Sequence, residues 1–336
     1  MRIKKVKVVN YKNFRDISFK PKSINIFIGK PNSGKSNLLE ALSLLGISNF
    51  MEEYIKSLAR FKGFYDFLHY GKGNSADVIV DLGDFEVYLK IWRHGRITMT
   101  DKNINDLKDL DKVKVFLDNY GDPLKLPPFS PFPIRKYTYD ENKFASGGFS
   151  DLDYLDYPYG RNVGEILQKN PDILLSIGEI FENFGLSLVV DLTTGNVEIH
   201  KYMGKGSVFK FDLNLVSDTL KRMIFYITAL KSNRDSVIIL EEPEIHTFPQ
   251  YIYRLSAEIV KSSRENNNQF FISTHNPYMF NGLLKWGEPD ELGIFKLEGN
   301  DRGEGEIYEL TEDDLVDIVE EGLDVFLNVE KWERGT

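Results

Sequence analysis

One stretch of eight residues, 29–36, constrains the fold more than any other part of the chain. It reads Gly-Lys-Pro-Asn-Ser-Gly-Lys-Ser and fits the pattern G-x-x-x-x-G-K-[ST] of a phosphate-binding loop, or P-loop. The apolar run Ile24–Ile28 before it predicts a short buried strand, and residues 37–45 behind it predict a helix. In this order, backbone N–H groups and the positive end of the helix dipole converge on one anion.

This loop predicts a site for ATP and Mg²⁺. Lys35 is expected to reach the β- and γ-phosphates, and the Ser36 hydroxyl to hold Mg²⁺. An ordinary turn with a helix cap is the alternative, but a lysine between a strand and a helix favours the nucleotide. The chain lacks the N-K-x-D motif that recognises guanine, which disfavours GTP. The residues expected to surround the nucleotide are Gly29, Lys30, Pro31, Asn32, Ser33, Gly34, Lys35, Ser36 and Asn37.

A second stretch carries carboxylates. Residues 237–240 are apolar and lead into Glu241-Glu242-Pro243-Glu244. An apolar run that ends in acids predicts a buried parallel strand of the Walker B kind, with its carboxylates at the edge where such sheets bind ligands. We expect Glu241 to bind Mg²⁺ through water, and Glu242 to orient or deprotonate the attacking water. Acids also mark strands that simply leave the core, so the P-loop upstream gives this motif its weight.

Two further segments complete the set. Residues 270–272 are apolar and precede Ser273-Thr274-His275, so His275 is expected beside the γ-phosphate, although a lone histidine after a strand is usually structural. Ser217 opens a helix whose apolar residues recur with a period of 3.6. It is either an ordinary N-cap or, if exposed, a group that binds the γ-phosphate held by a second subunit.

Composition limits the class of protein. The 336 residues are 42% hydrophobic and 28% charged, as in soluble globular proteins with a substantial core. We expect a cytoplasmic protein with no membrane partner, because no apolar run approaches a membrane span and the N-terminus lacks a signal-peptide pattern. The absence of cysteine excludes disulfides and thiolate chemistry. Because the net charge is −9, a DNA contact is expected only from a local basic patch within the first 30 residues.

The motifs also divide the chain. We predict a split ATP-binding core, an inserted helical and β lobe, and a C-terminal helical segment, at residues 1–48 with 206–310, 49–205 and 311–336 respectively. Within the lobe we expect a β-meander, a loop rich in Pro, Tyr and Gly, two helices and a hairpin, over residues 76–99, 119–163, 163–184 and 186–200. The loop is either plain surface or a partner-binding or gating segment.

The order of these motifs resembles that of ABC-type ATPase heads. Asn10-Tyr11-Lys12-Asn13-Phe14-Arg15, with Ser-Asn-Leu-Leu-Glu-Ala-Leu after the P-loop lysine, is similar to RecF and the SMC-related repair ATPases. Glu241-Glu242-Pro243-Glu244 with His246, followed by Ser273-Thr274-His275-Asn276-Pro277, is similar to OLD-type ATPases of bacteria and archaea. The similarity covers roughly residues 1–48 and 210–282.

The resemblance implies an α/β P-loop NTPase fold with ABC-ATPase-head architecture. That fold has a central, mostly parallel sheet flanked by helices, an N-terminal antiparallel β-subsheet and an inserted lobe. It implies a homodimer closed by ATP, in which one subunit supplies Lys35, Ser36, Glu241, Glu242 and His275, and its partner supplies Ser217. It also implies nucleotide contacts from Asn13 and Arg15.

Two departures from the family pattern stand out. Thr219 follows Asp218 directly, where a signature glycine is usual. No glutamine lies between the P-loop and Gln168 to serve in a Q-loop, so Asn142 or a nearby acid is expected to replace it.

The expected function is ATP hydrolysis to ADP and phosphate. ATP-dependent head-to-head dimerisation would control a DNA repair, recombination or phage-defence transaction, or a separate protein effector. The alternative is a slow-turnover nucleotide-binding switch or scaffold that regulates such an effector. A transporter subunit is disfavoured by the RecF-like start, and a fused nuclease is not expected because only 61 residues follow His275.

Overall fold

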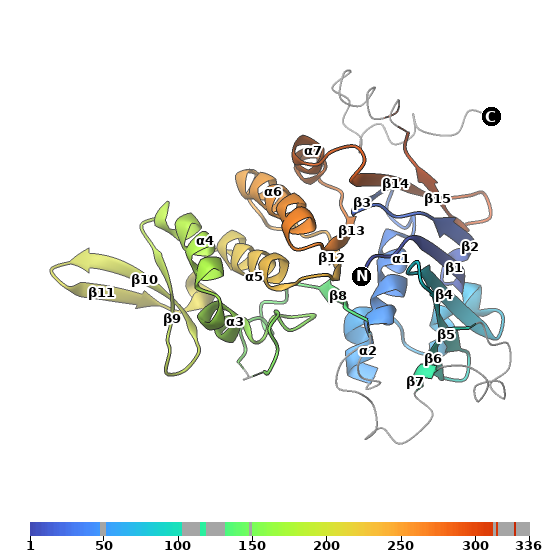
Figure 1. The fold of residues 1–336 in the computed structure, drawn as a ribbon, viewed down its shortest axis with the longest axis horizontal. Helices are drawn as coiled ribbons and strands as arrows, with labels where there is room; N and C mark the ends of the chain where they lie inside the picture. Colours follow the sequence, from blue (N-terminus) through green and yellow to red (C-terminus); the bar gives the residue numbers. More distant parts are fainter. Residues whose placement is uncertain are drawn as a thin grey trace.

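The protein is built on two six-stranded sheets, with a third, three-stranded sheet at one end (Figure 1). The computed structural model describes residues 1–47, 52–102, 115–118, 132–147, 150–311, 314 and 326. The expected mixed α/β fold, with a parallel-rich sheet and an antiparallel subsheet, is confirmed.

The parallel-rich sheet carries the predicted motifs. Its strand order is β15-β14-β3-β13-β12-β8, and all neighbours run parallel except β15 beside β14. The strands are β3 (Ile24–Ile28), β8 (Ile134–Tyr137), β12 (Val237–Glu241), β13 (Gln269–Ser273), β14 (Leu292–Gly299) and β15 (Gly305–Glu309).

Helices cover both faces of this sheet, which explains why its central strands are apolar throughout. On one face, α1 (Lys35–Ser43) packs with Phe27, Ile239 and Phe271. The opposite face, which carries Ile26 and Leu240, packs against three helices. These are α5 (Asp218–Ser232), α6 (Pro249–Glu265) and α7 (Pro277–Trp286).

The antiparallel sheet lies against α1 and has the strand order β2-β1-β4-β5-β6-β7. Its strands are β1 (Lys5–Tyr11), β2 (Phe14–Phe19), β4 (Ser75–Asp81), β5 (Glu86–Trp92), β6 (Ile97–Thr100) and β7 (Val115–Asp118). Between β3 and β4 lie α1, α2 (Glu52–Leu58) and three 3₁₀ helices, η1 (Leu44–Gly46), η2 (Phe64–Phe67) and η3 (His69–Gly71). The meander β4–β6 forms as expected, and its first strand pairs with β1. The domain boundaries stay a prediction.

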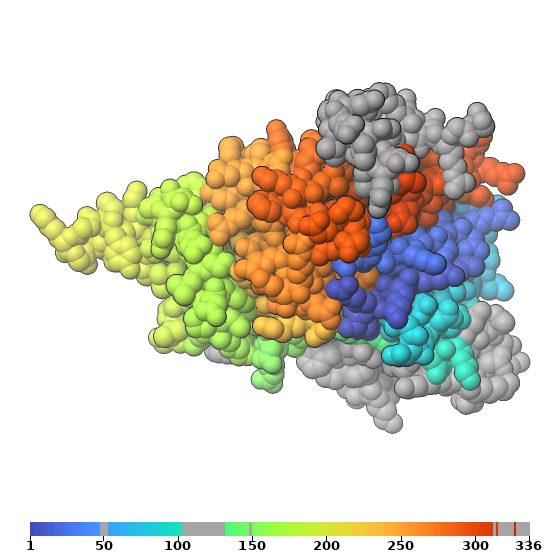
Figure 2. All heavy atoms as spheres, turned by 45° about the horizontal axis from the view of Figure 1, so that its top comes forward, coloured from blue at the N-terminus to red at the C-terminus, as the bar shows by residue number. Residues whose placement is uncertain are grey.

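The third sheet forms an arm that extends away from the body (Figure 1). It follows α3 (Val163–Lys169) and α4 (Pro171–Glu182), and its strands are β9 (Ser187–Val190), β10 (Val197–Gly204) and β11 (Ser207–Phe211). The two helices and the first two strands match the expectation, and β11 was missed. Figure 2 shows the end of the arm as a narrow projection. A 3₁₀ turn, η6 (Leu213–Leu215), leads from β11 to α5.

The sequence also missed β8, which falls inside the stretch expected to be a loop. Arg135 and Lys136 interrupt its apolar pattern, so a strand was not recognised there. Residues 119–131 and 148–149 of that stretch lie outside the described residues, as does the predicted C-terminal helical segment apart from residues 311, 314 and 326. In the part of the chain that the structure describes, no helix has both the length and the apolar character needed to span a bilayer.

Candidate functional site

Parallel pairing brings the predicted motifs to one edge of the sheet. Glu241 on β12 lies opposite Ser273 on β13, and Ser273 lies opposite Phe27 on β3. The P-loop, the two glutamates and the Ser-Thr-His segment therefore leave their strands at the same carboxyl edge. This is the edge at which open α/β sheets bind ligands.

Two glycines shape the P-loop. Gly29 has φ +148°, and a Cβ there would lie 2.2 Å from the Leu297 carbonyl oxygen. Gly34 has φ +107°, and a Cβ there would lie 2.6 Å from the Asn13 side chain. The loop backbone thus passes too close to its neighbours for any larger residue, and it reaches the start of α1 by a turn that favours glycine.

Lys35 lies within the curve of this loop. It is 5% exposed, and its Nζ donates to the carbonyl oxygens of Gly29 (2.7 Å) and Lys30 (3.0 Å). Burial lowers the pKa of Lys35 to about 8, although the Glu242 carboxylate opposes the shift. The ammonium is therefore desolvated and held by neutral carbonyl groups, a setting in which an anionic phosphate oxygen would be a stronger partner.

Ser36, the first residue after Lys35 in α1, meets the Walker B strand. Its side chain is hydrogen-bonded to Glu241, whose Oε2 also lies 3.0 Å from the Nζ of Lys136 on β8. Burial would raise the pKa of Glu241, but the Lys136 ammonium and the Ser36 hydroxyl outweigh it and hold that pKa below its usual value. Glu241 is therefore ionised at neutral pH.

Two unpartnered hydroxyl groups flank Glu241. Ser273 is paired with Glu241 in the sheet, and Thr138 follows β8 at the same level, one residue after the Tyr137–Leu240 pair. The Oγ of Ser273 and the Oγ1 of Thr138 are both buried without a hydrogen-bond partner. One carboxylate and several hydroxyl oxygens form a donor set that suits Mg²⁺, which takes one or two carboxylates and completes its shell with water and phosphate. The described residues contain no cluster of three or more His, Cys, Asp or Glu that would hold a metal by itself.

Glu242 and His275 come together as neighbours. His275 Nε2 lies 3.3 Å from Glu242 Oε1. Burial and the Lys35 charge lower the pKa of His275, so its imidazole is neutral at pH 7 despite the Glu242 carboxylate. Glu242 itself has φ +44°, a left-handed conformation that only surrounding structure can maintain in a glutamate.

Glu244 ties the two loops of the site together. Its Oε1 accepts hydrogen bonds from Thr274 Oγ1 (2.5 Å) and from the backbone N–H of His275 (3.3 Å). Burial raises the pKa of Glu244 to about 7. The loop after β12 therefore holds the loop after β13 in position through a carboxyl group that titrates near neutrality.

Of the two residues that the resemblance added, only Asn13 reaches the P-loop. Its Oδ1 accepts from Asn37 Nδ2 (2.8 Å), and its Nδ2 donates to the Ser33 carbonyl (3.3 Å). The Arg15 side chain is 69% exposed and lies 3.7 Å from Glu304. Carboxylates also offset other parts of the predicted basic patch, since Lys7 pairs with Asp16, Lys12 with Glu40 and Lys22 with Glu309.

Ser217 is exposed at the start of α5 and has no capping hydrogen bond from its side chain. Its contacts are local, with its carbonyl accepting the N–H of Lys221. Thr219, which stands where a signature glycine is usual, links α5 to the loop after Glu244. Its Oγ1 accepts from the Phe248 N–H (3.2 Å) and lies 3.3 Å from the His246 carbonyl oxygen, to which it donates.

Sequence reasoning missed Lys136 and Thr138. Both lie on β8 or just after it, in a stretch that was expected to be a loop, and a lysine in a strand usually indicates a solvated face. Asn142, the expected Q-loop substitute, is exposed in the following turn. The one signal for residues 134–138 is topological: β12 has β8 as its second neighbour, so a parallel strand had to be found elsewhere in the sequence.

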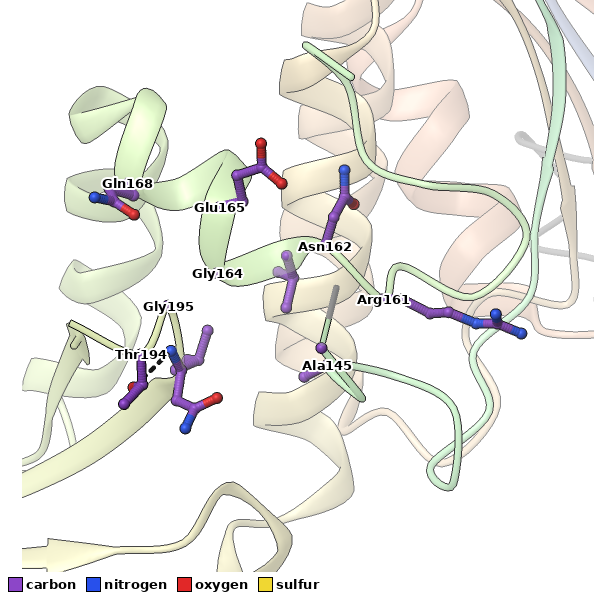
Figure 3. A pocket seen from close by; sticks show the side chains of 12 residues that line it. Ala145, Arg161, Asn162, Gly164, Glu165, Gln168, Thr194 and Gly195 are labelled. Carbon is purple, nitrogen blue, oxygen red and sulfur yellow. Dashed lines mark hydrogen bonds between the residues drawn. The ribbon is translucent and has the colours of Figure 1, made fainter. Parts of the chain in front are cut away.

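A separate hollow lies at the root of the arm (Figure 3). It has a volume of about 50 Å³, and Asn162, Glu165, Gln168 and Thr194 are among its lining residues. This is room for one or two waters and far too little for a nucleotide. Its polar groups are also engaged, since Asn162 Nδ2 donates to Ser150 Oγ and the Ser150 N–H donates to Glu165.

Comparison with known proteins identifies the fold. The solved structures that share the fold include an SMC head bound to the C-terminal winged-helix domain of ScpA, with TM-score 0.62, 18% identity, and coverage of 94% of this chain and 100% of that one. A Pyrococcus furiosus SMC head with an extended coiled coil, bound to the C-terminal domain of ScpA, gives TM-score 0.58 at 14% identity, with coverage of 95% and 99%. A Thermotoga maritima SMC head gives TM-score 0.50 at 17% identity, with coverage of 93% and 100%.

At such low identities these structures define the fold alone, and no curated protein matches the sequence. The family is set by a sequence model described as "AAA domain, putative AbiEii toxin, Type IV TA system", which matches residues 24–281. Because that match spans well over half of the 336 residues, the chain belongs to this AAA domain family, as a P-loop ATPase with the ABC-type head fold of SMC proteins.

Proposed function

We propose that the chain binds ATP with Mg²⁺ at the P-loop edge and hydrolyses it within a head-to-head homodimer. The observation that carries this proposal is the convergence of Lys35, Ser36 and Glu241 with the Glu242–His275 pair at one sheet edge. Phosphoryl transfer to water is one of the few reactions that need a desolvated lysine, a carboxylate–hydroxyl pair and a second carboxylate so close together.

In this proposal Lys35 leaves the loop carbonyls and binds the β- and γ-phosphates. Ser36 and Glu241 would hold Mg²⁺, which when bound would neutralise negative charge on the phosphates. Glu242 accepts the proton of the attacking water, and neutral His275 orients that water or donates to the γ-phosphate. The 3.3 Å contact between His275 and Glu242 allows the histidine to respond when the base changes its charge.

Dimerisation would place Ser217 of the partner subunit against the γ-phosphate. The exposed position of Ser217 supports this role, because an exposed helix N-terminus can bind an anion outside its own subunit. The start of α5 and the loop after Glu244, which Thr219 links, each have an exposed apolar side chain nearby in the sequence. Leu215 is 76% exposed and Phe248 is 62% exposed. Large exposed apolar side chains beside polar groups are typical of protein interfaces, which bury the apolar side chains in the core and keep polar groups at the rim.

The dimerisation cycle would control a DNA repair, recombination or phage-defence transaction, as in the RecF-, SMC- and OLD-type ATPases that the sequence resembles. One observation favours the second candidate, a slow switch that regulates a separate effector. Lys35 and Glu241 already have partners in the structure, so both contacts must be broken before the nucleotide is fully bound. Slow turnover would follow from that rearrangement.

The test is the solution mass of Glu242→Gln with and without Mg-ATP, measured by light scattering. Glutamine keeps the shape of the side chain but cannot accept the proton, so ATP should bind, persist and trap a dimer. Wild-type protein should pass through the dimer transiently, and phosphate release should fall by roughly 100-fold or more in the variant.

A monomer mass with ATP demonstrably bound would contradict the dimerisation cycle and leave the switch as the better candidate. Normal phosphate release by Glu242→Gln would show that another group is the base.

A further inference from the structure

Lys136 is a buried lysine whose side chain ends inside the candidate site. It lies on β8, is 6% exposed, and pairs in the sheet with Ile239, two residues before Glu241. Side chains two residues apart on a strand share a face. The Lys136 stem therefore runs along the face that carries Glu241, and its ammonium reaches the carboxyl edge.

The ammonium is held by two oxygens. Its Nζ lies 3.0 Å from Glu241 Oε2 and 3.3 Å from the Leu58 carbonyl oxygen. Lys35 is bonded to the P-loop carbonyls, and the nearby Arg60 guanidinium is bonded through Nε to Glu40 Oε1 (2.5 Å). Of these three cations, Lys136 is thus the one in direct contact with Glu241.

The position of this contact gives it a consequence for a metal ion. Ser36, Thr138 and Ser273 present hydroxyl oxygens around the same carboxylate, two of them without any partner. An ammonium on one carboxylate oxygen and a hydrated divalent cation beside the same carboxylate compete for one negative charge. They also repel each other in a site where burial weakens screening.

We propose that Lys136 is the resident counter-cation of Glu241 and a positioning residue that sets the Mg²⁺ concentration needed for nucleotide binding. The proposal rests on the proposed ATP site and deepens it. Without Mg²⁺ the lysine holds the carboxylate ionised and in place. With Mg²⁺ the Lys136–Glu241 contact must open or stretch, so the chain requires more Mg²⁺ than it would with a neutral residue at position 136.

The molecule contains a matched control for burying and pairing a lysine. Lys90 on β5 is 5% exposed, and its Nζ lies 3.1 Å from Asp77 Oδ2 on the neighbouring strand β4. This pair has the same chemistry and nearly the same burial, but it lies in the antiparallel sheet away from the P-loop. Any effect common to both lysines reflects packing, and an effect of Lys136 alone reflects the metal site.

The experiment measures binding of a fluorescent ATP analogue by anisotropy while free Mg²⁺ is varied in a chelator-buffered series. Lys136→Met retains the volume of the side chain and removes its charge, so the midpoint Mg²⁺ concentration should fall by at least about threefold, the scale of one partly exposed ion pair. Lys136→Arg keeps the charge and should retain the wild-type midpoint. Lys90→Met should retain it as well.

Circular dichroism establishes that each variant is folded, and Lys136→Gln serves as the neutral variant if methionine prevents folding. An unchanged or higher midpoint in the folded neutral variant, with wild-type protein binding normally, would overturn the role of Lys136 alone. Failure of wild-type protein to bind the analogue at any Mg²⁺ concentration would overturn the ATP site and, with it, the role of Lys136.

Discussion

The carboxyl edge of the parallel sheet and the β10–β11 hairpin of the arm depart from the usual distribution of side chains in opposite ways. At the edge, charged and polar groups such as Lys35, Lys136 and Glu244 are buried at 5%, 6% and 5% exposure. On the hairpin, the large side chains of Tyr202 and Phe209 are 68% and 56% exposed. Buried polar groups and exposed apolar groups are the two informative exceptions in a folded protein. Changes at the edge should therefore be severe and specific, and changes to the exposed side chains of the hairpin nearly silent for folding.

The largest effect is expected at Lys35. Lys35→Ala removes the ammonium that would bind two phosphates, and the loss of such charge-assisted hydrogen bonds should weaken ATP binding by roughly 100-fold. Fluorescence titration with an ATP analogue measures this. The control is Lys20→Ala, which removes an exposed lysine outside the site. Unchanged affinity in Lys35→Ala would contradict the assignment of residues 29–36 as a nucleotide-binding P-loop.

The second effect tests whether Ser217 is needed for dimerisation but not for ATP binding by the monomer. In a Glu242→Gln background, Ser217→Arg should leave ATP binding by the monomer within about twofold and prevent the dimer, because a bulky cation occupies the proposed contact. The control is Ser207→Arg, which changes another exposed serine at the start of β11 on the arm. Light scattering with Mg-ATP should find a dimer for the control only. A dimer in both variants would remove Ser217 from the interface.

The third effect concerns Glu244 and pH. Its folded pKa of about 7 lies above the ordinary value of 4.5, so the protonated form is favoured in the fold. The stability that this provides is present below pH 4.5 and is lost as the pH rises toward 7. Between pH 5.5 and 8 the loss from this group should be about 2 kcal/mol.

Glu244→Gln should remove that part of the pH dependence, as measured by denaturant unfolding at the two pH values. Glu179→Gln, at a side chain 71% exposed, is the control and should leave the dependence as it is. An identical pH dependence in wild-type protein and Glu244→Gln would show that the buried carboxyl group does not titrate in this range.

The smallest effect is expected on the hairpin. Tyr202→Ser should change the free energy of unfolding by no more than about 0.5 kcal/mol, since the side chain is largely hydrated in the fold. Ile199→Ser, on the same strand but fully buried, should destabilise by more than about 2 kcal/mol. Thermal or denaturant unfolding distinguishes the two. A large loss in Tyr202→Ser would mean that the exposed end of the arm is part of the folding core.

The sequence predicted the strands that lead into the candidate site because each motif combines a local pattern with its own strand. Gly29–Ser36, Glu241–Glu242 and His275 each follow an apolar run, and parallel pairing then places them together. The nucleotide contact of Arg15 rests on the resemblance alone and stays a prediction, because its side chain is exposed beside Glu304. The Lys136–Glu241 contact joins residues 105 positions apart in the chain, and no local pattern encodes it.

The β10–β11 hairpin is poorly predicted from the sequence for a different reason. The sequence predicts a strand over residues 197–200, whose first three residues are buried, but the rest of β10 and all of β11 mix lysine, glycine and aromatic residues on two exposed faces. Without a buried face the period of two disappears from the sequence. Strand pairing by backbone hydrogen bonds then remains as the feature that defines β11.

The strand order of the parallel sheet also determines how late in synthesis the P-loop strand can pair. β3, which carries the P-loop, has β13 and β14 as its two neighbours, and both are made after residue 268. A ribosome-bound chain therefore exposes the P-loop strand without a sheet partner for most of its synthesis, and long-range pairing of this kind forms slowly. A translation product that ends before residue 269 therefore lacks both sheet neighbours of the P-loop strand, and the candidate site cannot be assembled on it.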